Sequence, residues 1–292
     1  MTPPRGSERP VETHRLLGWR RIAGAMWRDP DDPQIYGALD VDARPVLAYI
    51  ARARATGHHL TPTHLVGRAL ARALVAVPDL NVRIRHGRAR PRASVDVFFI
   101  TAIAGGRDLS GVKIHDAAGK PAIELAAELG RRGRAMKQGD DADFARTKRL
   151  TDRLPAWLLR PALRATAFLT QELHLDVPQL ALHREPFGSA MVSSVGMLGL
   201  PRGFIPLAWM YDVPLLILVG EIAEQPVAID GRVEARPMLP MTATIDHRYV
   251  DGWHVARAMA AFREYLAAPE RVEPALGPEA TDPARAVAAS LG

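Results

Sequence analysis

The chain of 292 residues contains no cysteine. This absence excludes disulfide bonds, thiolate metal ligands and cysteine nucleophiles, and it favours a reducing compartment. The sequence also lacks any run approaching the roughly 18 apolar residues of a membrane-spanning helix. Residues 1–7 lack the apolar core of a signal peptide. We therefore expect a soluble, cytoplasmic protein.

Lysine is scarce, since only four of the 38 basic residues are lysine and arginine carries nearly all of the positive charge. The arginines gather at residues 83–92 and 131–134. Such clusters can bind the phosphates of nucleic acid or of a nucleotide-bearing ligand. A solvated strand edge and a solvated helix face are the simpler explanation, which we prefer. Because no aromatic residue is interleaved with these arginines, we expect no nucleic-acid partner.

Several motifs of catalysis and metal binding are missing. Residues 106–111 have the glycine spacing of a phosphate-binding loop, but the required Lys-Ser/Thr does not follow. The Gly-x-Ser-x-Gly turn of many hydrolases is absent. Neither His58-His59 nor the pair His247 and His254 has a third ligand at metal spacing, so we predict no metal site.

The patterns that are present predict one domain with mobile ends. Residues 1–12 are expected to form a mobile arm, residues 13–270 the domain, and residues 271–292 a flexible tail. Apolar periodicity predicts helices at 45–55, 63–77, 122–136 and 255–267, and strands at 35–41, 95–103, 190–194, 215–221, 226–229 and 240–245. Asp230-Gly231 predicts a hairpin turn. Because regular βαβ alternation is absent, the expected class is α+β with a mixed, largely antiparallel sheet.

Residues 140–186 interrupt this pattern and are predicted to contain a helical insert. Arg153, Arg160 and Arg164 would share one helix face, which makes the segment basic and amphipathic. Pro161 is expected to interrupt the helix. A membrane-surface anchor is one interpretation of this pattern. Packing of the insert on its own domain is preferred, and we expect no membrane contact.

One short stretch, residues 244–252, combines a titratable base, a carboxylate and a turn. His247 stands four residues before Asp251-Gly252, between a predicted strand and a predicted helix. Histidine is the usual general base near neutral pH, and Asp251 could orient it or pair with an arginine. The alternative is a surface or capping histidine without chemistry.

A second stretch, residues 187–199, is a strand of small residues that runs into glycines. Ser193 and Ser194 end this strand just before Gly196. A serine in this position can direct its hydroxyl into a cleft and stabilise an oxyanion. The alternative is that the glycines only satisfy the backbone geometry of a turn.

The order of these motifs resembles the catalytic domain of the dihydrolipoyl acyltransferases, the core subunits of 2-oxoacid dehydrogenase complexes. Asp246-His247-Arg248-x-x-Asp251-Gly252 is similar to the active-site signature of that family. Further similar segments follow the family's order at 21–26, 60–63, 69–74, 78–81, 192–199, 216–220, 230–231 and 236–239. The resemblance covers about residues 13–270 apart from the insert. It implies a two-layer α/β sandwich like that of chloramphenicol acetyltransferase.

The resemblance also implies a mechanism and a set of site residues. His247 would take the proton from a thiol of coenzyme A or of dihydrolipoamide, and the thiolate would attack a thioester. Ser193, or Ser194 beside it, would stabilise the oxyanion, and Asp251 would hold the histidine loop. Ser194, Gly196 and Gly252 would contribute to substrate binding. In this family the site lies between the chains of a homotrimer, so His247 and Ser193 would come from neighbouring copies.

The chain also departs from the family pattern. We expect no lipoyl attachment site and no subunit-binding domain in it, so a lipoyl domain would be supplied in trans and acyl-CoA would be the other partner. The segment at 140–186 is longer than the usual connection. These departures leave open a second function, a non-catalytic scaffold or assembly subunit related to the acyltransferase core.

Overall fold

The computed structural model describes residues 32–103, 108–138, 155–177 and 183–276. Gln34–Gly292 forms one compact unit, distinct from Met1–Pro33. Several sequence predictions lie outside the described residues: the arm at 1–12, the family-like segment at 21–26, the parts of the insert at 140–154 and 178–182, and the tail from 277 onward. The description below concerns the unit that begins at Gln34.

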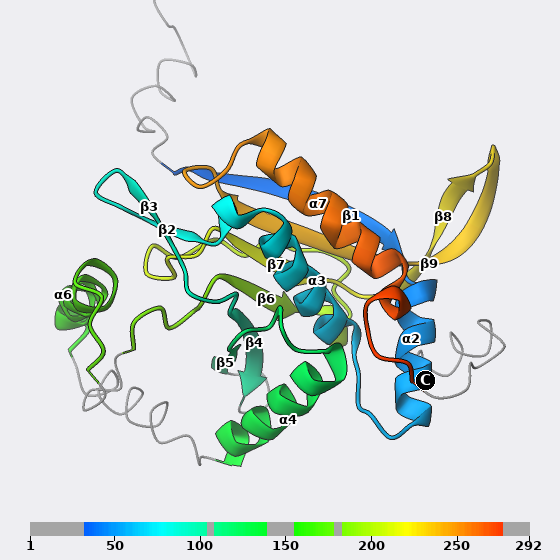
Figure 1. The fold of residues 1–292 in the computed structure, drawn as a ribbon, viewed down its shortest axis with the longest axis horizontal. Helices are drawn as coiled ribbons and strands as arrows, with labels where there is room; N and C mark the ends of the chain where they lie inside the picture. The colour runs from blue at the N-terminus through cyan, green and yellow to red at the C-terminus, as the bar shows by residue number, and fades with distance from the viewer. Residues whose placement is uncertain (1–31, 104–107, 139–154, 178–182, 277–292) are drawn as a thin grey trace, which may run out of the picture. The chain divides into compact units, whose positions relative to one another are not determined.

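The elements follow one another in a mixed order (Figure 1). The strands are β1 (Gln34–Asp42), β2 (Val82–Arg85), β3 (Arg88–Pro91), β4 (Val97–Ile103), β5 (Asp108–Ile114), β6 (Ala190–Ser194), β7 (Leu215–Val219), β8 (Ala223–Ile229) and β9 (Arg232–Asp246). The helices are α2 (Arg44–Ala55), α3 (Pro62–Ala76), α4 (Ala122–Gln138), α6 (Ala156–Ala167) and α7 (Gly252–Ala267). Short helical turns are η1 (Pro78–Leu80), η3 (Phe168–Glu172), η5 (Gly196–Leu198) and η6 (Pro269–Arg271).

Among the described residues, seven strands form one sheet in the order β1-β9-β7-β6-β4-β5, with β8 paired to β9. The pairs β4–β6 and β6–β7 are parallel, and the other pairs of this sheet are antiparallel. The predicted class, α+β with a mixed and largely antiparallel sheet, is therefore confirmed.

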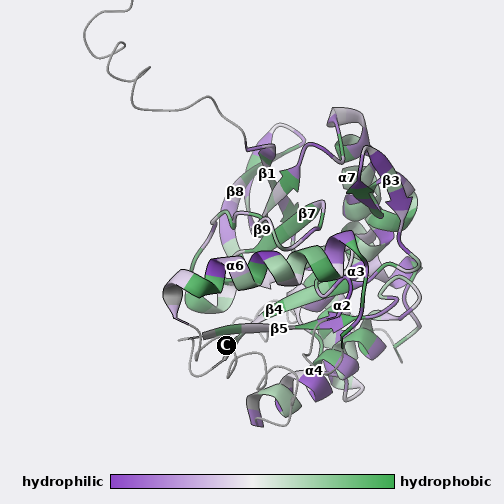
Figure 2. Cartoon of the chain, turned by 90° about the vertical axis from the view of Figure 1, so that its left-hand side faces the viewer, coloured by the Kyte–Doolittle hydropathy of each residue, from purple (hydrophilic) through white to green (hydrophobic). Residues whose placement is uncertain are grey.

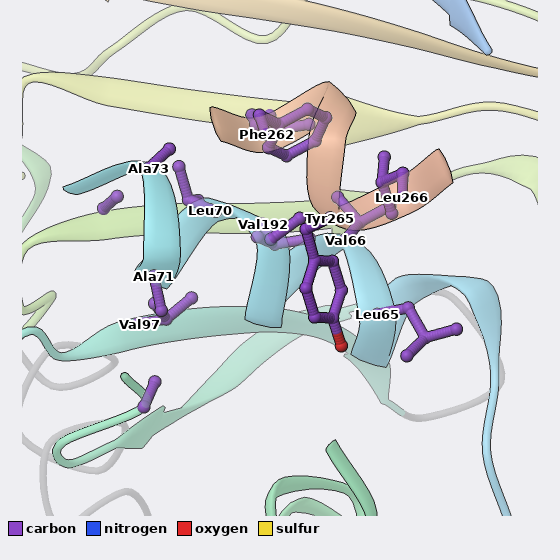
Figure 3. Packing of buried hydrophobic residues seen from close by; sticks show 14 of the residues in the cluster. Leu65, Val66, Leu70, Ala71, Ala73, Val97, Val192, Phe262, Tyr265 and Leu266 are labelled. Carbon is purple, nitrogen blue, oxygen red and sulfur yellow. The ribbon is translucent and has the colours of Figure 1, made fainter. Parts of the chain in front are cut away.

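The main core lies between one face of this sheet and the helices α2, α3, α4 and α7 (Figure 1). Alternate residues of the strands point toward the helices, as Val97 and Val192 do. Apolar side chains of α3 and α7, including Leu70 and Phe262, gather with these strand residues, as Figure 3 shows. The apolar spacing that predicted α3 and α7 is the spacing that builds this core.

A smaller apolar cluster covers part of the other face of the sheet. Met191 and Leu216 form its buried centre, and the Phe187 ring packs edge-on against Phe98 and Tyr211 at 5.1 and 4.8 Å between centroids. The chain between η5 and β7 lies over this face. It is fixed there by hydrogen bonds such as that from the Leu207 amide to the Gln34 side chain, at 2.6 Å. The sheet is thus covered by helices on one face and partly by irregular chain on the other.

Two hairpins turn through residues with a left-handed backbone, and the sequence predicted one of them. The predicted turn at Asp230-Gly231 joins β8 to β9, with φ of 48° and 79° at its two residues. The β2–β3 hairpin turns in the same left-handed way at His86 and Gly87, with φ of 49° and 69°. Sequence patterns did not predict this second hairpin, because its strands consist mainly of arginine. They also did not predict β5, whose glycine spacing resembled a phosphate loop.

The predicted helical insert contains α6, which continues into η3. The expectation that Pro161 interrupts this helix is wrong, because α6 runs through it. Pro161 and Trp157 are exposed, so the Trp157 carbonyl that loses its backbone donor faces water. Figure 2 shows polar and apolar residues mixed along α6. None of the helices in the described segments is long and apolar enough to cross a membrane.

The start of the predicted tail is packed against the domain. Glu273 is buried and ion-paired with Arg68 at 3.0 Å, and it also accepts hydrogen bonds from the Tyr265 hydroxyl and the Ala122 amide. Arg68 donates further bonds to the backbone after β5. The predicted tail boundary at 271 therefore precedes residues that hold α3, α4 and α7 together.

A buried histidine makes the stability of this helix layer depend on pH. The His64 side chain, at the start of α3, accepts a hydrogen bond from the Thr61 amide on Nδ1 at 3.2 Å. Burial lowers the pKa of His64 from 6.5 to about 4, with a smaller contribution from nearby His59. The unfolded chain therefore binds a proton at a pH where folded His64 remains neutral.

We predict that the free energy of unfolding falls as the pH decreases from 6.5 toward 4, with no contribution from this residue above that window. The pKa difference corresponds to a loss of about 2–3 kcal/mol by pH 4.5. Urea unfolding of wild type and His64→Gln at pH 7 and 4.5 measures this effect as a steeper pH dependence in wild type. The exposed neighbour His58, changed to Gln, is the control. Equal pH dependence in wild type and His64→Gln would contradict the prediction.

Candidate active site

The face of the sheet opposite the main core carries Ser193, one of the side chains that the sequence singled out. Ser193 of β6 pairs with Leu218 of β7, which pairs with Thr242 of β9. Because side chains alternate along strands, Ser193 and Thr242 share the face opposite the main core. Ser193 is buried among the strands, whereas Ser194 is partly exposed. The Thr242 hydroxyl donates to the Gly203 carbonyl, which ties the covering chain to this face.

His247 lies at the tip of the tight turn that ends β9. The Asp246 amide donates to the Pro214 carbonyl at 2.8 Å, and the Tyr249 amide donates to the Asp246 carbonyl at 3.1 Å. The Arg248 guanidinium binds the Asp246 carboxylate at 2.6 Å, and the Arg248 amide donates to the same group at 2.9 Å. The residues on both sides of His247 are therefore fixed, while its own side chain is exposed.

The contacts of Asp251 differ from the two that its position in the sequence suggested, orientation of His247 and pairing with an arginine. Its carboxylate caps α7 by accepting from the Trp253 amide at 3.0 Å and from the His254 amide at 3.3 Å. The His254 side chain contacts it at 2.8 Å and lowers the pKa of the Asp251 carboxyl. Within the described residues these contacts go to α7, and none goes to His247 or to an arginine. Asp251 thus fixes the start of the helix that follows the turn.

The two glycines predicted to bind substrate differ in their surroundings. A Cβ on Gly196 would lie 2.6 Å from the Gly220 carbonyl oxygen, so this glycine is required where two backbone segments meet. A Cβ on Gly252 would meet no atom within 4 Å, and its φ is ordinary. Close backbone packing explains why residue 196 is a glycine. Nothing inside the described part of this chain requires a glycine at position 252.

A single chain does not bring Ser193 and His247 together. The register places two strand spacings of about 4.8 Å and four residue steps of about 3.3 Å between Ser193 and Asp246. Their Cα atoms are therefore separated by roughly 16 Å, with β7 between them. The two predicted catalytic side chains lie on separate parts of the same molecule.

An apolar cavity of about 70 Å³ lies on the opposite side of the sheet, under α7. It is lined by small and apolar residues such as Gly37, Ala73 and Ala258. Because Ser193 faces away from this cavity, we regard it as a packing gap where Gly37 has no side chain.

Comparison with known proteins bears directly on this region. Residues 181–273 match the family model "2-oxoacid dehydrogenases acyltransferase (catalytic domain)". The matched stretch runs from before β6 to beyond α7, and so contains both Ser193 and the His247 turn. Over this stretch the chain is similar to the catalytic domain of the 2-oxoacid dehydrogenase acyltransferases. The match agrees with the resemblance found in the sequence motifs.

Several solved structures are similar to this chain in fold over most of its length. A probable dihydrolipoamide acetyltransferase from Listeria monocytogenes has a TM-score of 0.61 at 18% identity, covering 91% of this chain and 99% of that one. The cubic core of a pyruvate dehydrogenase multienzyme complex has a TM-score of 0.61 at 19% identity, covering 92% and 98%. The dihydrolipoamide acetyltransferase of Azotobacter vinelandii has a TM-score of 0.59 at 20% identity, covering 92% and 98%. The predicted two-layer fold of this family is confirmed.

Curated relatives match over shorter stretches. A probable dihydrolipoyllysine-residue succinyltransferase component from Schizosaccharomyces pombe is 31% identical over 96 residues, which are 32% of this chain and 20% of that protein. A dihydrolipoyllysine-residue acetyltransferase component from Staphylococcus aureus is 33% identical over 79 residues, which are 27% and 18%. The match thus spans about a fifth of each relative's length.

The structure also shows contacts that the sequence did not indicate. Arg83 and Arg92 of the first arginine cluster are buried and ion-paired with Glu185, so a solvated strand edge is the wrong explanation for them. The Tyr249 hydroxyl donates to the Asp212 carboxylate at 3.2 Å. No sequence signal could have indicated these pairs, because the partners are far apart in the chain. In the described part of the chain, no group of His, Asp and Glu is arranged to hold a metal ion.

Exchanging each of the two glycines for alanine separates packing from other roles. Gly196→Ala is expected to lower the free energy of unfolding by about 1–3 kcal/mol, because its Cβ collides with backbone. Gly252→Ala is the control and should leave stability unchanged or raise it by up to about 1 kcal/mol, since alanine favours helices. Thermal unfolding of both variants checks this expectation. A Gly196→Ala protein as stable as wild type would contradict it.

Proposed function

We propose that this protein transfers acyl groups between thiols, coenzyme A on one side and a dihydrolipoamide-like thiol on the other. The observation that carries the proposal is the family match over residues 181–273, which contains Ser193 and the complete His247 turn. The relatives' names support the same chemistry, since they are dihydrolipoyllysine-residue acyltransferases. A lipoyl domain supplied in trans is the proposed partner.

In the proposed mechanism, His247 is the general base. Its imidazole takes the proton from the attacking thiol, and the thiolate adds to the thioester carbonyl. The Ser193 hydroxyl donates a hydrogen bond to the oxyanion of the tetrahedral intermediate, while Ser194 is the adjacent alternative. Collapse of the intermediate releases the second thiol as a thiolate, which regains the proton from the imidazolium. Asp251 holds the start of α7 and thereby the end of the histidine turn.

We further propose that each site forms between two copies of the chain, as in a homotrimer. The roughly 16 Å that separates Ser193 from the His247 turn within one chain supports this arrangement. The open space at Gly252 leaves room for a substrate or a neighbouring chain. The segment after β6 also exposes large apolar side chains that a second copy could cover: Met197, Leu198, Leu200, Phe204 and Trp209.

The related acetyltransferase of Azotobacter vinelandii was studied for the role of a serine, a histidine and an asparagine in its catalytic mechanism. The histidine and asparagine there stand four positions apart, as His247 and Asp251 do here. This spacing supports the assignment of His247 as the base, with Asp251 in place of the amide.

Mixing two variants, each of which lacks one of the two catalytic side chains, tests the proposal. His247→Ala should lower kcat for acyl transfer from acetyl-CoA to dihydrolipoamide by about 10²–10⁴-fold. Ser193→Ala should lower it by about 10²–10³-fold. Co-expressed as mixed trimers, the two variants should recover up to about a quarter of wild-type activity, because one interface in four then has both groups.

The recovery is the decisive result, since each variant alone lacks one group at every interface. Thermal midpoints and sedimentation of both variants serve as controls for folding and assembly. Assembled trimers without recovery would contradict the shared site. A wild-type chain that binds its copies but shows no thiol-dependent turnover would instead favour the scaffold function.

A further inference from the structure

Glu185, at the end of the segment that joins α4 to β6, neutralises two buried arginines of the β2–β3 region. Its carboxylate lies 2.8 Å from Arg83 Nε and 3.1 Å from Arg92 Nη1. The two arginine side chains are 9% and 1% exposed, and the Glu185 carboxylate forms an ion pair with each of them. Their contacts have ion-pair distances without hydrogen-bond angles, which makes the charge itself important.

The same segment also holds Arg85 in the β2–β3 hairpin. Glu172 of η3 is 3.2 Å from Arg85 Nε, and the Gln171 carbonyl accepts from the same nitrogen at 3.3 Å. The segment thus contacts the hairpin at two places, through η3 and through Glu185. Both contacts fix guanidinium groups that point toward a third element.

That third element is the loop before β7, at Asp212. Arg85 Nη2 is 2.7 Å from the Asp212 carboxylate, and Arg92 Nη2 donates to the Asp212 carbonyl at 2.6 Å. Asp212 has a φ of 54°, a left-handed conformation that its neighbours must maintain. Two arginines therefore fix both the backbone and the carboxylate of this residue.

Asp212 in turn contacts the His247 turn. Tyr249 stands two residues after His247. Its hydroxyl donates to Asp212 Oδ1 at 3.2 Å. The Tyr249 ring is buried, and burial together with Asp212 raises its pKa to about 12, so the hydroxyl remains a donor at neutral pH. The turn is thus held at one end by Asp246 and at the other by Asp212.

We propose that Asp212 is a positioning residue for the His247 turn, and that Glu172 and Glu185 hold Asp212 in place through Arg85 and Arg92. The proposal rests on the proposed role of His247 as the base. It gives the long connection between α4 and β6 a part in the site. Glu172 and Glu185, both in the described parts of this connection, bind the arginines that reach Asp212.

Tyr249→Phe tests the contact between Asp212 and the His247 turn, because it removes only the hydroxyl that reaches Asp212. We expect kcat for acyl transfer to fall by roughly 10–100-fold, with KM for both thiol substrates changed less than about twofold. Amide exchange at residues 247–250, measured without substrate, should become faster by about tenfold. Tyr211→Phe is the matched control, since its ring packs on Phe187 and its hydroxyl is not the one bound to Asp212.

Unchanged exchange and unchanged kcat in Tyr249→Phe would overturn the proposal, as would an equal effect in Tyr211→Phe. The exchange measurement separates this outcome from a failure of the proposed function. If wild type has no acyl-transfer activity, faster exchange in Tyr249→Phe still supports the positioning role, and unchanged exchange refutes it.

Glu185→Gln tests the ion pairs of Glu185 with Arg83 and Arg92, because it keeps the side-chain shape and removes the charge. The same signature is expected, a lower kcat at constant KM and faster exchange at residues 247–250. Asp176→Asn is the matched control in the same segment, where Asp176 pairs with exposed Arg184 at 3.0 Å. If Glu185→Gln folds and exchanges like the control, the segment does not hold the turn.

Discussion

Backbone pairing along β9 connects most of the features that matter in this protein. This strand pairs with β1, β7 and β8, and it ends at Asp246, where the His247 turn begins. Its alternation places Leu239 and Met241 in the main core and Thr242 on the opposite face. A shift of one residue in this register would exchange the two faces and move the turn. The position of His247 therefore depends on the same pairing that builds the core.

Buried arginines form the second constraint on this structure. Arg68 pairs with Glu273, and Arg83 and Arg92 pair with Glu185. A buried ion pair of this kind adds little net stability, because both charges lose their hydration. Loss of one partner is nevertheless costly, since it leaves an unpaired charge in the interior. These pairs thus determine which distant segments lie together more than they determine how stable the domain is.

The candidate site combines a rigid frame with an exposed histidine. Asp246, Arg248 and Tyr249 are fixed by hydrogen bonds around His247, whose exposed imidazole can meet a substrate. Ser193 lies on β6, and β7 separates it from the strand that ends at the His247 turn. An active site shared between copies fits this division, because each copy would supply one prearranged half.

The sequence by itself determined several local elements and the resemblance to the acyltransferase family. Helical periodicity predicted α3 and α7, the strand pattern predicted β6 at Ala190–Ser194, and Asp230-Gly231 predicted the β8–β9 turn. These signals are local, because propensity and turn chemistry act over a few residues. Only the tertiary structure decided the partners of Asp251, the depth of Arg83 and Arg92, and the separation of Ser193 from His247. Those features depend on which remote segments meet, and neither composition nor short-range spacing specifies such contacts.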